Sequence, residues 1–441
     1  MHTPEPTTLS NDARIVIIGA GQAGGWAAHT LRDEKFAGTI TLIGEEPWPP
    51  HERPPLSKAV LAGVAPPEST HLFPLTEWAA LDIDWRGHHK VLAIDRAART
   101  VDLDDGNSVG WDRLILCTGG RARTLTIPGL EEASTTLRTI DDSIQLHHRL
   151  RPASRLLIVG GGWIGLEVAA TARQLGVDVT VIETAPQLCA RSLPAEAAQL
   201  LASLHKQNGV HILLGGGLCD AKKNADGSIT AQLSITNQQK PTRKRTESVV
   251  NSSAGHAVTE QITADVIVAG IGMIPNDELA RSAGVACANG VLVDQYCRTS
   301  DPSIFAAGDV AINSGGRATK PFRLESWQNA QQQGIAAARC ALGAGTPYEP
   351  MPWFWSDQFG VNVQILGTTN DADQWIVRGS PQCITSETSV IFFYLRGGIL
   401  RGVIGFNAGR DIRTARRLIE QSTVLDTDAL ANPSVSLKTL A

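Results

Sequence analysis

Two glycine motifs have the spacing that lets a polypeptide backbone approach a phosphate group. Each reads G-x-G-x-x-G, and the six positions are Gly19, Gly21, Gly24, Gly160, Gly162 and Gly165. Glycine permits a tight turn and close contact, and the helix that follows offers free N–H groups and the positive end of its dipole. One such motif is weak evidence, but two in one chain predict two sites for dinucleotides.

An acidic residue follows each motif at the distance of a ribose ligand. Glu45 comes 26 residues after Gly19, and Glu183 comes 23 residues after Gly160. The expected distance is about 20 residues, and the carboxylate would bind ribose hydroxyls. Glu46 is the alternative in the first motif, because Gly44 occupies the position that matches Glu183. A carboxylate repels a 2′-phosphate, so Glu183 favours NAD over NADP, although the nearby Arg191 weakens this inference.

The elements that must position these residues repeat along the chain. Apolar β-branched runs predict buried parallel strands before each motif, a small-residue helix after it, and a further strand ending near each acidic residue. The predicted strands are 14–18, 40–43 and 113–117 in the first unit, and 155–159, 177–184 and 265–269 in the second. The sequence therefore predicts an α/β protein with two Rossmann-like units.

The order of these patterns along the chain predicts three domains, one of them in two segments. We expect an FAD-binding domain in two segments, 10–124 and 277–335, an NAD-binding domain over 125–276, and a C-terminal α+β domain over 336–441. The polar stretch 224–263 reads as a long hairpin or loop within the second unit, and its basic residues 240–245 are a solvated loop or a docking patch. A helix is expected over 326–342 and a basic helix over 410–421.

Composition excludes several classes of protein. The chain has 441 residues and a net charge of −5, which gives no basic field for nucleic acid. It has no apolar run of about 18 residues that could span a membrane, and no basic and apolar start typical of a secretory signal. Its seven cysteines are scattered without a C-x-x-C pair, so we expect reduced thiols, a cytoplasmic location and no metal site.

Five segments together resemble the FAD-dependent ferredoxin reductases of Rieske-type aromatic-ring dioxygenase systems. They are also similar to segments of putidaredoxin and rubredoxin reductases. The segments are EEPWPPHERPPLSK, GGGWIGLEVAA, SIFAAGDV, RLESWQNAQQQG and PWFWSDQFGVNVQILG. The resemblance extends from about residue 14 to 417, and it implies a glutathione-reductase-like fold. The hairpin near 235–258 departs from it, because that hairpin is usually shorter.

The resemblance also implies roles for individual residues around FAD. The first glycine motif would hold FAD with Glu45 on its ribose, and Arg53 and Lys58 would lie by the cofactor, Lys58 near the flavin N5 edge. Asp309 would bind the ribityl chain, although an acidic residue there can instead cap a helix. Trp327 would contact the isoalloxazine, although a lone tryptophan is more often part of a core.

The second motif would hold NADH, with Glu183 on the adenosine ribose. Glu167, in the first turn of the following helix, would pair with Lys58, because an unpaired buried carboxylate is costly; interaction with the helix dipole is the alternative. Trp163 matches a position where related flavoproteins place an aromatic ring over the flavin. It would cover the nicotinamide site as a lid, or it is simply a packing residue.

The predicted function is a ferredoxin–NAD(+) reductase. NADH reduces FAD, and single electrons pass to a separate 2Fe-2S ferredoxin that feeds an oxygenase. The alternatives are an NADH oxidase, peroxidase or disulfide reductase, and a flavoprotein similar to apoptosis-inducing factor. Disulfide chemistry needs a cysteine beside the flavin, yet residues 47–58 contain none. Arg410, Arg413 and Arg417 share one helical face, which is a candidate docking site for an acidic ferredoxin or a solvated surface.

Overall fold

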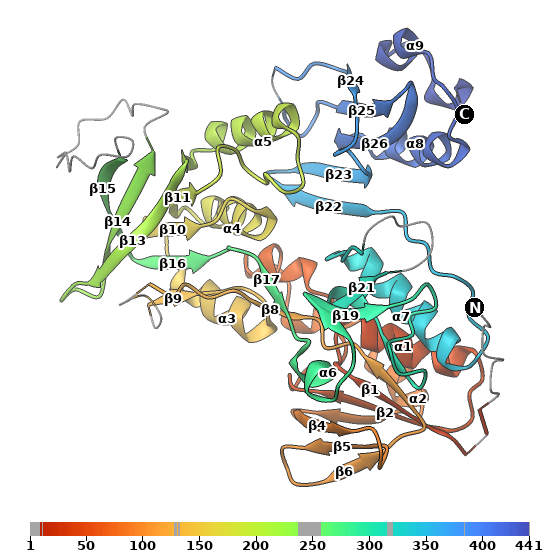
Figure 1. Cartoon of the computed structure of the whole chain (residues 1–441). Coiled ribbons are helices and arrows are strands. Elements are labelled where there is room, and N and C mark those ends of the chain that lie inside the picture. Colours follow the sequence, from red (N-terminus) through yellow and green to blue (C-terminus); the bar gives the residue numbers. More distant parts are fainter. Residues whose placement is uncertain are drawn as a thin grey trace. The chain divides into compact units, whose positions relative to one another are not determined.

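A computed structural model describes residues 9–10, 12–127, 130, 133–236, 257–314, 321–382 and 384–440 (Figure 1). Contacts divide the chain into two compact units. Unit 1 contains Met1–Pro54, Pro67–Arg121 and Met273–Met351, and unit 2 contains Pro55–Pro66, Ala122–Gly272 and Pro352–Ala441. The bounds of the four predicted domain segments remain predictions. The basic stretch 240–245 lies outside the described residues.

The centre of unit 1 is a parallel sheet that carries the first glycine motif at the end of its middle strand. Its order is β20-β7-β1-β2-β3, and the strands are β1 (Arg14–Ile18), β2 (Thr39–Gly44), β3 (Asp84–Gly87), β7 (Arg113–Leu116) and β20 (Ile304–Ala306). Every strand pair in it is parallel. Helix α1 (Gln22–Asp33) connects β1 to β2, which is the predicted βαβ unit.

Both faces of this sheet are buried, which explains the continuous apolar run of β1. Ile15 and Ile17 join a cluster with residues of α1 and α7 (Trp327–Ala341). Val16 and Ile18 point to the other face and join residues of the small sheet β4-β5-β6. Since successive side chains of a strand alternate between faces, a strand covered on both sides needs apolar residues throughout.

Shorter elements complete unit 1. Its remaining helices and strands are α2 (Leu75–Ala80), β4 (Val91–Asp95), β5 (Thr100–Leu103), β6 (Ser108–Gly110), β17 (Met273–Pro275), α6 (Glu278–Ser282), β18 (Cys287–Ala288), β19 (Gly290–Val293) and β21 (Ala311–Asn313), with the 3-10 turns η2 (Pro67–Thr70) and η3 (Gly308–Val310). The turn η1 (Pro54–Ser57) and strand β8 (Gly120–Ala122) lie at the boundaries between the units.

Unit 2 repeats the same sheet, as the second glycine motif predicts. The order is β12-β11-β10-β16-β9, and the strands are β9 (Ser134–Thr135), β10 (Arg155–Val159), β11 (Asp178–Glu183), β12 (His211–Leu214) and β16 (Val266–Ala269). Its helices are α3 (Ile140–Arg149), α4 (Trp163–Gln174) and α5 (Ala195–Gln207). Again β10 alternates between two cores, Leu156 and Ile158 in one and Leu157 and Val159 in the other.

The polar stretch predicted as a hairpin or loop belongs to an antiparallel sheet where the structure describes it. Strands β13 (Gly216–Lys223), β14 (Ile229–Thr236) and β15 (Ala257–Ala264) pair in sequence order. Ala231 and Leu233 of β14 are buried against the central sheet of unit 2. This sheet therefore covers one face of the nucleotide-binding fold, and its position explains why apolar residues alternate within a polar segment.

The C-terminal region is an antiparallel sheet with helices, as expected of an α+β domain. Its order is β22-β23-β26-β25-β24. The elements are β22 (Trp353–Gln358), β23 (Val361–Gly367), β24 (Gln374–Arg378), β25 (Val390–Arg396), β26 (Ile399–Phe406), α8 (Gly409–Gln421), α9 (Thr427–Ala431) and η4 (Leu437–Thr439). Apolar residues of this sheet, including Val361 and Phe392, share a core with Leu201 of α5.

These elements confirm the predicted fold class, which is two Rossmann-like units and a C-terminal α+β domain. The helices expected over 326–342 and 410–421 are present as α7 and α8, with bounds that differ by one residue at the ends. None of the helices in the described part of the chain is long and apolar enough to cross a membrane.

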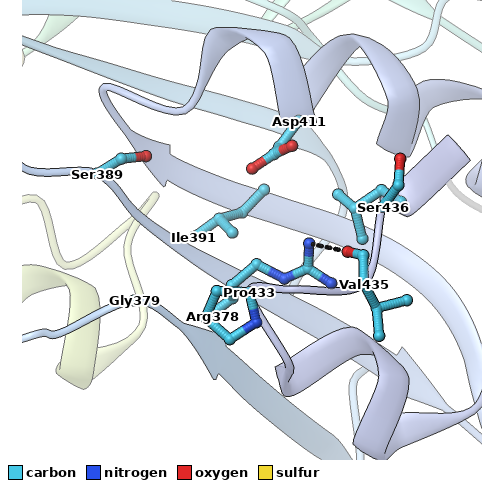
Figure 2. A pocket seen from close by; sticks show the side chains of 9 residues that line it. Arg378, Gly379, Ser389, Ile391, Asp411, Pro433, Val435 and Ser436 are labelled. Atoms are coloured by element: carbon cyan, nitrogen blue, oxygen red, sulfur yellow. Dashed lines mark hydrogen bonds between the residues drawn. The ribbon is translucent and has the colours of Figure 1, made fainter.

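The end of the chain is held by one buried cation. The guanidinium of Arg378 donates hydrogen bonds to the carbonyl oxygens of Ala429, Leu430 and Val435 at 2.8–3.0 Å, and Figure 2 shows the bond to Val435. Arg378 lines a hollow of about 310 Å³ together with Ser389, Ile391, Asp411, Pro433 and other neighbours. None of the predicted site residues lines this hollow, so we interpret Arg378 as a structural anchor for the last segment.

We expect Arg378→Leu to lower the free energy of unfolding of the C-terminal region by ~3 kcal/mol, because one buried and two partly buried carbonyl groups lose a charged donor. Arg396→Leu is the matched control, since Arg396 is 62% exposed and pairs with Asp371; such a pair contributes less than about 1 kcal/mol. Urea unfolding followed by circular dichroism, with limited proteolysis of the last 60 or so residues, measures both. Equal effects of the two variants would contradict the anchor.

Candidate functional site

The three glycines of the first motif play different parts. Gly19 has φ +104°, and a Cβ there would lie 2.2 Å from the carbonyl oxygen of Cys117. A Cβ on Gly24 would lie 1.9 Å from the carbonyl oxygen of Gly19. A Cβ on Gly21 would have no described atom within 4 Å. The first glycine therefore lets the end of β1 lie close to the segment after β7, and the third lets α1 pack on β1. The second borders open space, where a ligand can approach the backbone.

The three glycines of the second motif differ in the same way. Gly160 has φ +108°, and its Cβ would lie 2.4 Å from the carbonyl oxygen of Gly270. A Cβ on Gly165 would lie 2.3 Å from the carbonyl oxygen of Gly160, whereas the nearest described atom to a Cβ on Gly162 is 3.8 Å away. Two independent units thus leave the same position open, which is what a bound pyrophosphate requires.

Both helix N-termini are suited to an anion. Gly21 and Gly162 are the N-cap residues of α1 and α4, and in the described structure neither helix has a side-chain cap or an acidic residue in its first turn. The first N–H groups of each helix are thus open to a ligand. The amide nitrogen and oxygen of Gln22 are also buried without a partner among the described residues. This set of groups fits a dinucleotide in each unit.

Strand register explains the position of the acidic residues. Ile18 pairs with Ile43 in unit 1, and Val159 pairs with Ile182 in unit 2. Gly44 and Glu183 therefore occupy equivalent positions. Glu183 is held in place by the N–H groups of Gly161 and Ala185, each 2.7 Å from one of its carboxylate oxygens. Its carboxylate stands directly beside the second glycine motif.

The acidic pair of unit 1 differs in its surroundings. Glu45 has a side chain that is 70% exposed, and one oxygen lies 3.1 Å from Nζ of Lys90. Glu46 is 26% exposed and accepts a 2.6 Å hydrogen bond from Arg53. The nearby His51 is buried, which, with the charge of Arg53, lowers its pKa to about 4. His51 is therefore neutral at physiological pH, and Arg53 supplies the positive charge beside Glu46.

Asp309 lies in the turn η3, which meets the start of α1. Gly308 has φ +79°, and a Cβ there would lie 2.9 Å from the Cβ of Ala23. The backbone of η3 therefore approaches the first turn of α1, and Asp309 stands beside the first glycine motif. The residue before η3 is Ala307, so the alternative that Asp309 is an N-cap is wrong. The carbonyl oxygen of Asp309 accepts a hydrogen bond from Arg323.

Trp327 begins helix α7, whose N-cap is Ser326. Its indole is half-buried, and Nε1 donates a 2.8 Å hydrogen bond to a carboxylate oxygen of Glu52. Glu52 is next to Arg53 in the sequence, and α7 packs on α1, since a Cβ on Gly334 would lie 2.3 Å from the carbonyl oxygen of Ala23. Unit 1 thus gathers the first motif, Asp309, Arg53 and Trp327.

Lys58 belongs to unit 2, although the residues just before it belong to unit 1. Three side chains of unit 2 hold the segment Pro55–Pro66 by its carbonyl groups. Thr171 donates to Ser57, Ser143 donates to Leu56, and His147 donates to Leu61, at 2.7–2.8 Å. Two of the donors, Ser143 and Thr171, are themselves buried. These anchors place Lys58 against α4.

The predicted ion pair between Lys58 and Glu167 is present. Nζ lies 2.8 Å from Oε1, and the side chains are 21% and 5% exposed. The hydroxyl groups of Ser57 and Ser356, neither of which was predicted as a site residue, also donate to this carboxylate. The prediction that Glu167 lies in the first turn of its helix is wrong, because α4 begins at Trp163 and Glu167 lies in its second turn. Because the dipole effect declines beyond the first turn, Lys58 and the two serines are its main partners.

Trp163 is the first residue of α4 and is half-buried. Its Nε1 donates a 3.0 Å hydrogen bond to the hydroxyl of Ser192, and its ring lies 4.9 Å from that of Phe354 at an angle of 45°. These contacts agree with a packing role within unit 2. The lid role remains a prediction, and opening such a lid would have to break the bond to Ser192.

Three further features bear on the chemistry of the site. The guanidinium of Arg191 lies beside Gly272, directly before β17, where a Cβ would be 3.4 Å from Nη2. The buried thiols are protonated, because burial raises the pKa of Cys117 to about 12 and that of Cys340 to about 11. Among the described residues there is no cluster of three or more His, Cys, Asp or Glu able to hold a metal ion.

Comparison with known proteins defines the class to which this fold and site belong. Residues 13–334 match the model of the pyridine nucleotide-disulphide oxidoreductases, and residues 353–441 match that of the reductase C-terminal domain. The first match covers most of the chain, so this protein belongs to the pyridine nucleotide-disulphide oxidoreductase family. It is an oxidoreductase of a family that depends on FAD and NAD(P)H.

Solved structures narrow the resemblance. Putidaredoxin reductase, solved as a covalent complex with putidaredoxin, is 33% identical with a TM-score of 0.86, over 97% of this chain and 98% of that one. The ferredoxin reductase of the CYP199A2 system from Rhodopseudomonas palustris has the same identity and score, over 97% and 100%. The predicted resemblance to this type of reductase is confirmed. A persulfide reductase from A. fulgidus, 21% identical with a TM-score of 0.81 over 97% and 82%, shares the fold.

The unequal roles of the glycines predict unequal effects on folding. We expect Gly24→Ala to lower the free energy of unfolding by about 1–3 kcal/mol, since α1 must move away from β1. Gly21→Ala should change it by less than about 1 kcal/mol, because its Cβ meets open space. Urea unfolding of both variants, stripped of bound dinucleotides, tests this. Comparable losses in the two variants would show that the second glycine also serves packing.

Proposed function

We propose that this protein is an NADH-dependent ferredoxin reductase that passes electrons to a separate 2Fe-2S ferredoxin, which feeds an oxygenase. The observation that carries the proposal is the pair of equivalent glycine cradles, one in each unit, in a chain 33% identical to two ferredoxin reductases. The FAD held by unit 1 would supply hydride chemistry toward NADH and one-electron chemistry toward a two-iron centre.

In unit 1 the residues of the chain would bind and orient FAD. Gly21 and the first N–H groups of α1 would contact the pyrophosphate, and Asp309 would bind the ribityl chain. Glu45 is proposed for the ribose because its side chain is 70% exposed, whereas that of Glu46 is 26% exposed and bonded to Arg53. Trp327 would support the isoalloxazine, held by its hydrogen bond to Glu52. No acid–base group is required, so catalysis rests on positioning.

In unit 2 the residues would bind NADH. Gly162 and the start of α4 would contact the pyrophosphate, and Glu183 would bind the adenosine ribose. Lys58, fixed by Glu167, would place its ammonium group by the flavin N5 edge, and Trp163 would cover the nicotinamide site. Hydride transfer needs donor and acceptor atoms about 3–3.5 Å apart. We propose that these residues hold the nicotinamide at that distance from the flavin.

The alternative chemistries have less support. A disulfide reductase or thiol peroxidase needs a reactive thiolate beside the flavin. Residues 47–58 contain no cysteine, and burial raises the pKa of Cys117, the first cysteine of the chain, to about 12. A water-forming oxidase and a flavoprotein with a mainly binding role remain to be separated by experiment. Two measurements separate a ferredoxin reductase, an oxidase and a binding flavoprotein: steady-state reduction of a 2Fe-2S ferredoxin by NADH, and oxygen consumption without the ferredoxin. A reductase reduces the ferredoxin, an oxidase consumes oxygen without it, and a binding protein is slow in both.

Glu183 should make NADH strongly preferred over NADPH. We expect Glu183→Gln to reduce the ratio of the two kcat/KM values by at least about tenfold, because the variant loses the charge that repels a 2′-phosphate. It keeps an oxygen for one of the N–H groups of Gly161 and Ala185. Glu183→Arg should reduce or invert the ratio by adding a phosphate partner.

Asp178→Asn is the matched control for this measurement. Asp178 begins the same strand, β11, and its side chain is 74% exposed. It should leave the cofactor ratio unchanged. Equal kcat/KM values for NADH and NADPH in the unaltered protein would contradict the assignment of Glu183 to the ribose.

The basic face of α8 is the proposed docking surface for the ferredoxin. Arg410, Arg413 and Arg417 are all exposed on this helix. Since 2Fe-2S ferredoxins are commonly acidic, such a face would steer their approach. A solvated helix would have the same exposure, so only a kinetic experiment separates the two interpretations.

Charge reversal by Arg413→Glu should raise the KM for ferredoxin several-fold at low salt, and the difference should shrink at high ionic strength as the charges are screened. Flavin reduction by NADH should be unaffected. Arg396→Glu serves as the control, because Arg396 is an exposed arginine at the end of β25, outside α8. A ferredoxin KM equal to that of the unaltered protein at low salt would reject this surface.

A further inference from the structure

Glu167 is one end of a buried series of hydrogen bonds that reaches well beyond Lys58. Ser356 of β22 donates to Glu167 Oε1 at 2.5 Å, and Nε2 of Gln358 lies 2.9 Å from the Ser356 hydroxyl oxygen. Oε1 of Gln358 lies 2.6 Å from Nε2 of His205 in α5. Ser356 and His205 are fully buried, and Gln358 is 1% exposed. The series therefore joins α4, β22 and α5 without access to water.

The direction of every hydrogen bond in this series is determined by its charged end. An ionised carboxylate only accepts, so the single hydroxyl proton of Ser356 must point to Glu167. The Ser356 oxygen then accepts from the NH₂ group of Gln358, and the carbonyl of that amide accepts from His205. Consequently His205 carries its proton on Nε2. Its Nδ1 is buried without a partner among the described residues, which disfavours a proton there because an unpaired buried donor is costly.

Each group in the series donates toward Glu167, and none adds a charge. Burial lowers the pKa of His205 to about 4, so its ring is neutral at physiological pH. Hydrogen bonds in a chain polarise one another, and donors that point the same way strengthen the bond to the final acceptor. The hydroxyl of Ser57 donates to the other carboxylate oxygen. Glu167 can thus remain ionised although it is 5% exposed, and its charge holds the ammonium group of Lys58.

We propose that Ser356, Gln358 and His205 are positioning residues for hydride transfer, because their one-way series of hydrogen bonds keeps Glu167 ionised and so fixes Lys58. The inference rests on the proposed function, in which Lys58 lies by the flavin. It gives the C-terminal sheet a part in the reduction of the flavin by NADH, in addition to any role in docking a partner.

The first test reads the proton position directly and does not depend on activity. Nitrogen-15 NMR of histidine-labelled holoenzyme, with the His205 signals assigned by a His205→Gln variant, should show a neutral ring protonated at Nε2. Ser356→Ala should shift these signals although Gln358 lies between the two residues, because the amide loses its acceptor. Ser203→Ala, a half-buried serine on the same helix α5 whose hydroxyl donates to the carbonyl oxygen of Gln199, should leave them unchanged. A ring protonated at Nδ1 in the unaltered protein would overturn the proposal.

The second test measures single-turnover flavin reduction by NADH. Removing a hydrogen bond to a charged group corresponds to roughly a tenfold effect, so Ser356→Ala should lower the limiting reduction rate about tenfold with little change in the Kd for NADH. Gln358→Met, which has a similar volume and no amide, should lower it by a smaller factor. Because both act through one series, the double variant should resemble Ser356→Ala alone.

Multiplicative effects in the double variant, or an unchanged rate in Ser356→Ala, would reject the positioning role. Should Ser356→Ala fail to fold, Gln358→Met carries the test, and Ser356→Thr, which keeps the hydroxyl, should retain the reduction rate and the His205 signals. If the unaltered protein is not reduced by NADH at all, the proposed function fails. The NMR result still decides whether the series of hydrogen bonds exists, so the two failures are distinguishable.

Discussion

A carboxylate buried in a protein must be both neutralised and hydrogen-bonded, and much of unit 2 is arranged to meet that requirement for Glu167. The transfer of an unpaired charge from water would cost several kcal/mol or more. Its partners come from two segments outside α4, namely Lys58 and Ser57 before the second glycine motif, and Ser356 of the C-terminal sheet. The segment Pro55–Pro66 therefore belongs to unit 2 for an electrostatic reason as well as through its carbonyl contacts with Ser143, Thr171 and His147.

The glycine motifs impose a second, steric constraint. At Gly19 and Gly24, and at their counterparts in unit 2, backbone atoms occupy the space of a Cβ. The helix after each motif can therefore lie close to the sheet, and its first N–H groups open onto the second glycine. Close packing and ligand binding are consequences of the same arrangement, which explains why one pattern of three glycines occurs twice with different neighbours.

Much of this arrangement could be predicted from the sequence, since it depends on local patterns. The apolar runs that flank Gly19 and Gly160 predicted two parallel sheets, and Gly44 was correctly matched to Glu183. Long-range hydroxyl contacts could not be predicted in the same way. Ser57 and Ser356 are separated from Glu167 by 110 and 189 residues. A serine also does not contribute to the apolar periodicity that indicates a buried position. The turn of α4 that holds Glu167 was misjudged because a glycine N-cap gives no side-chain signal for the first residue of a helix.

Neutral hydrogen-bond donors stabilise a buried carboxylate without adding a charge, whereas a second cation would add one. Among the residues that the structure describes, Lys58 is the cation paired with Glu167, so the pair adds no net charge to a region proposed to receive an anionic dinucleotide. A second lysine or arginine would leave a surplus positive charge that attracts the phosphates to the wrong place. Ser57, Ser356, Gln358 and His205 stabilise the ionised carboxylate through dipoles instead. The cost is that each member must keep its orientation, and this explains why the series is enclosed by α5 and the C-terminal sheet, where side chains have little freedom to rotate.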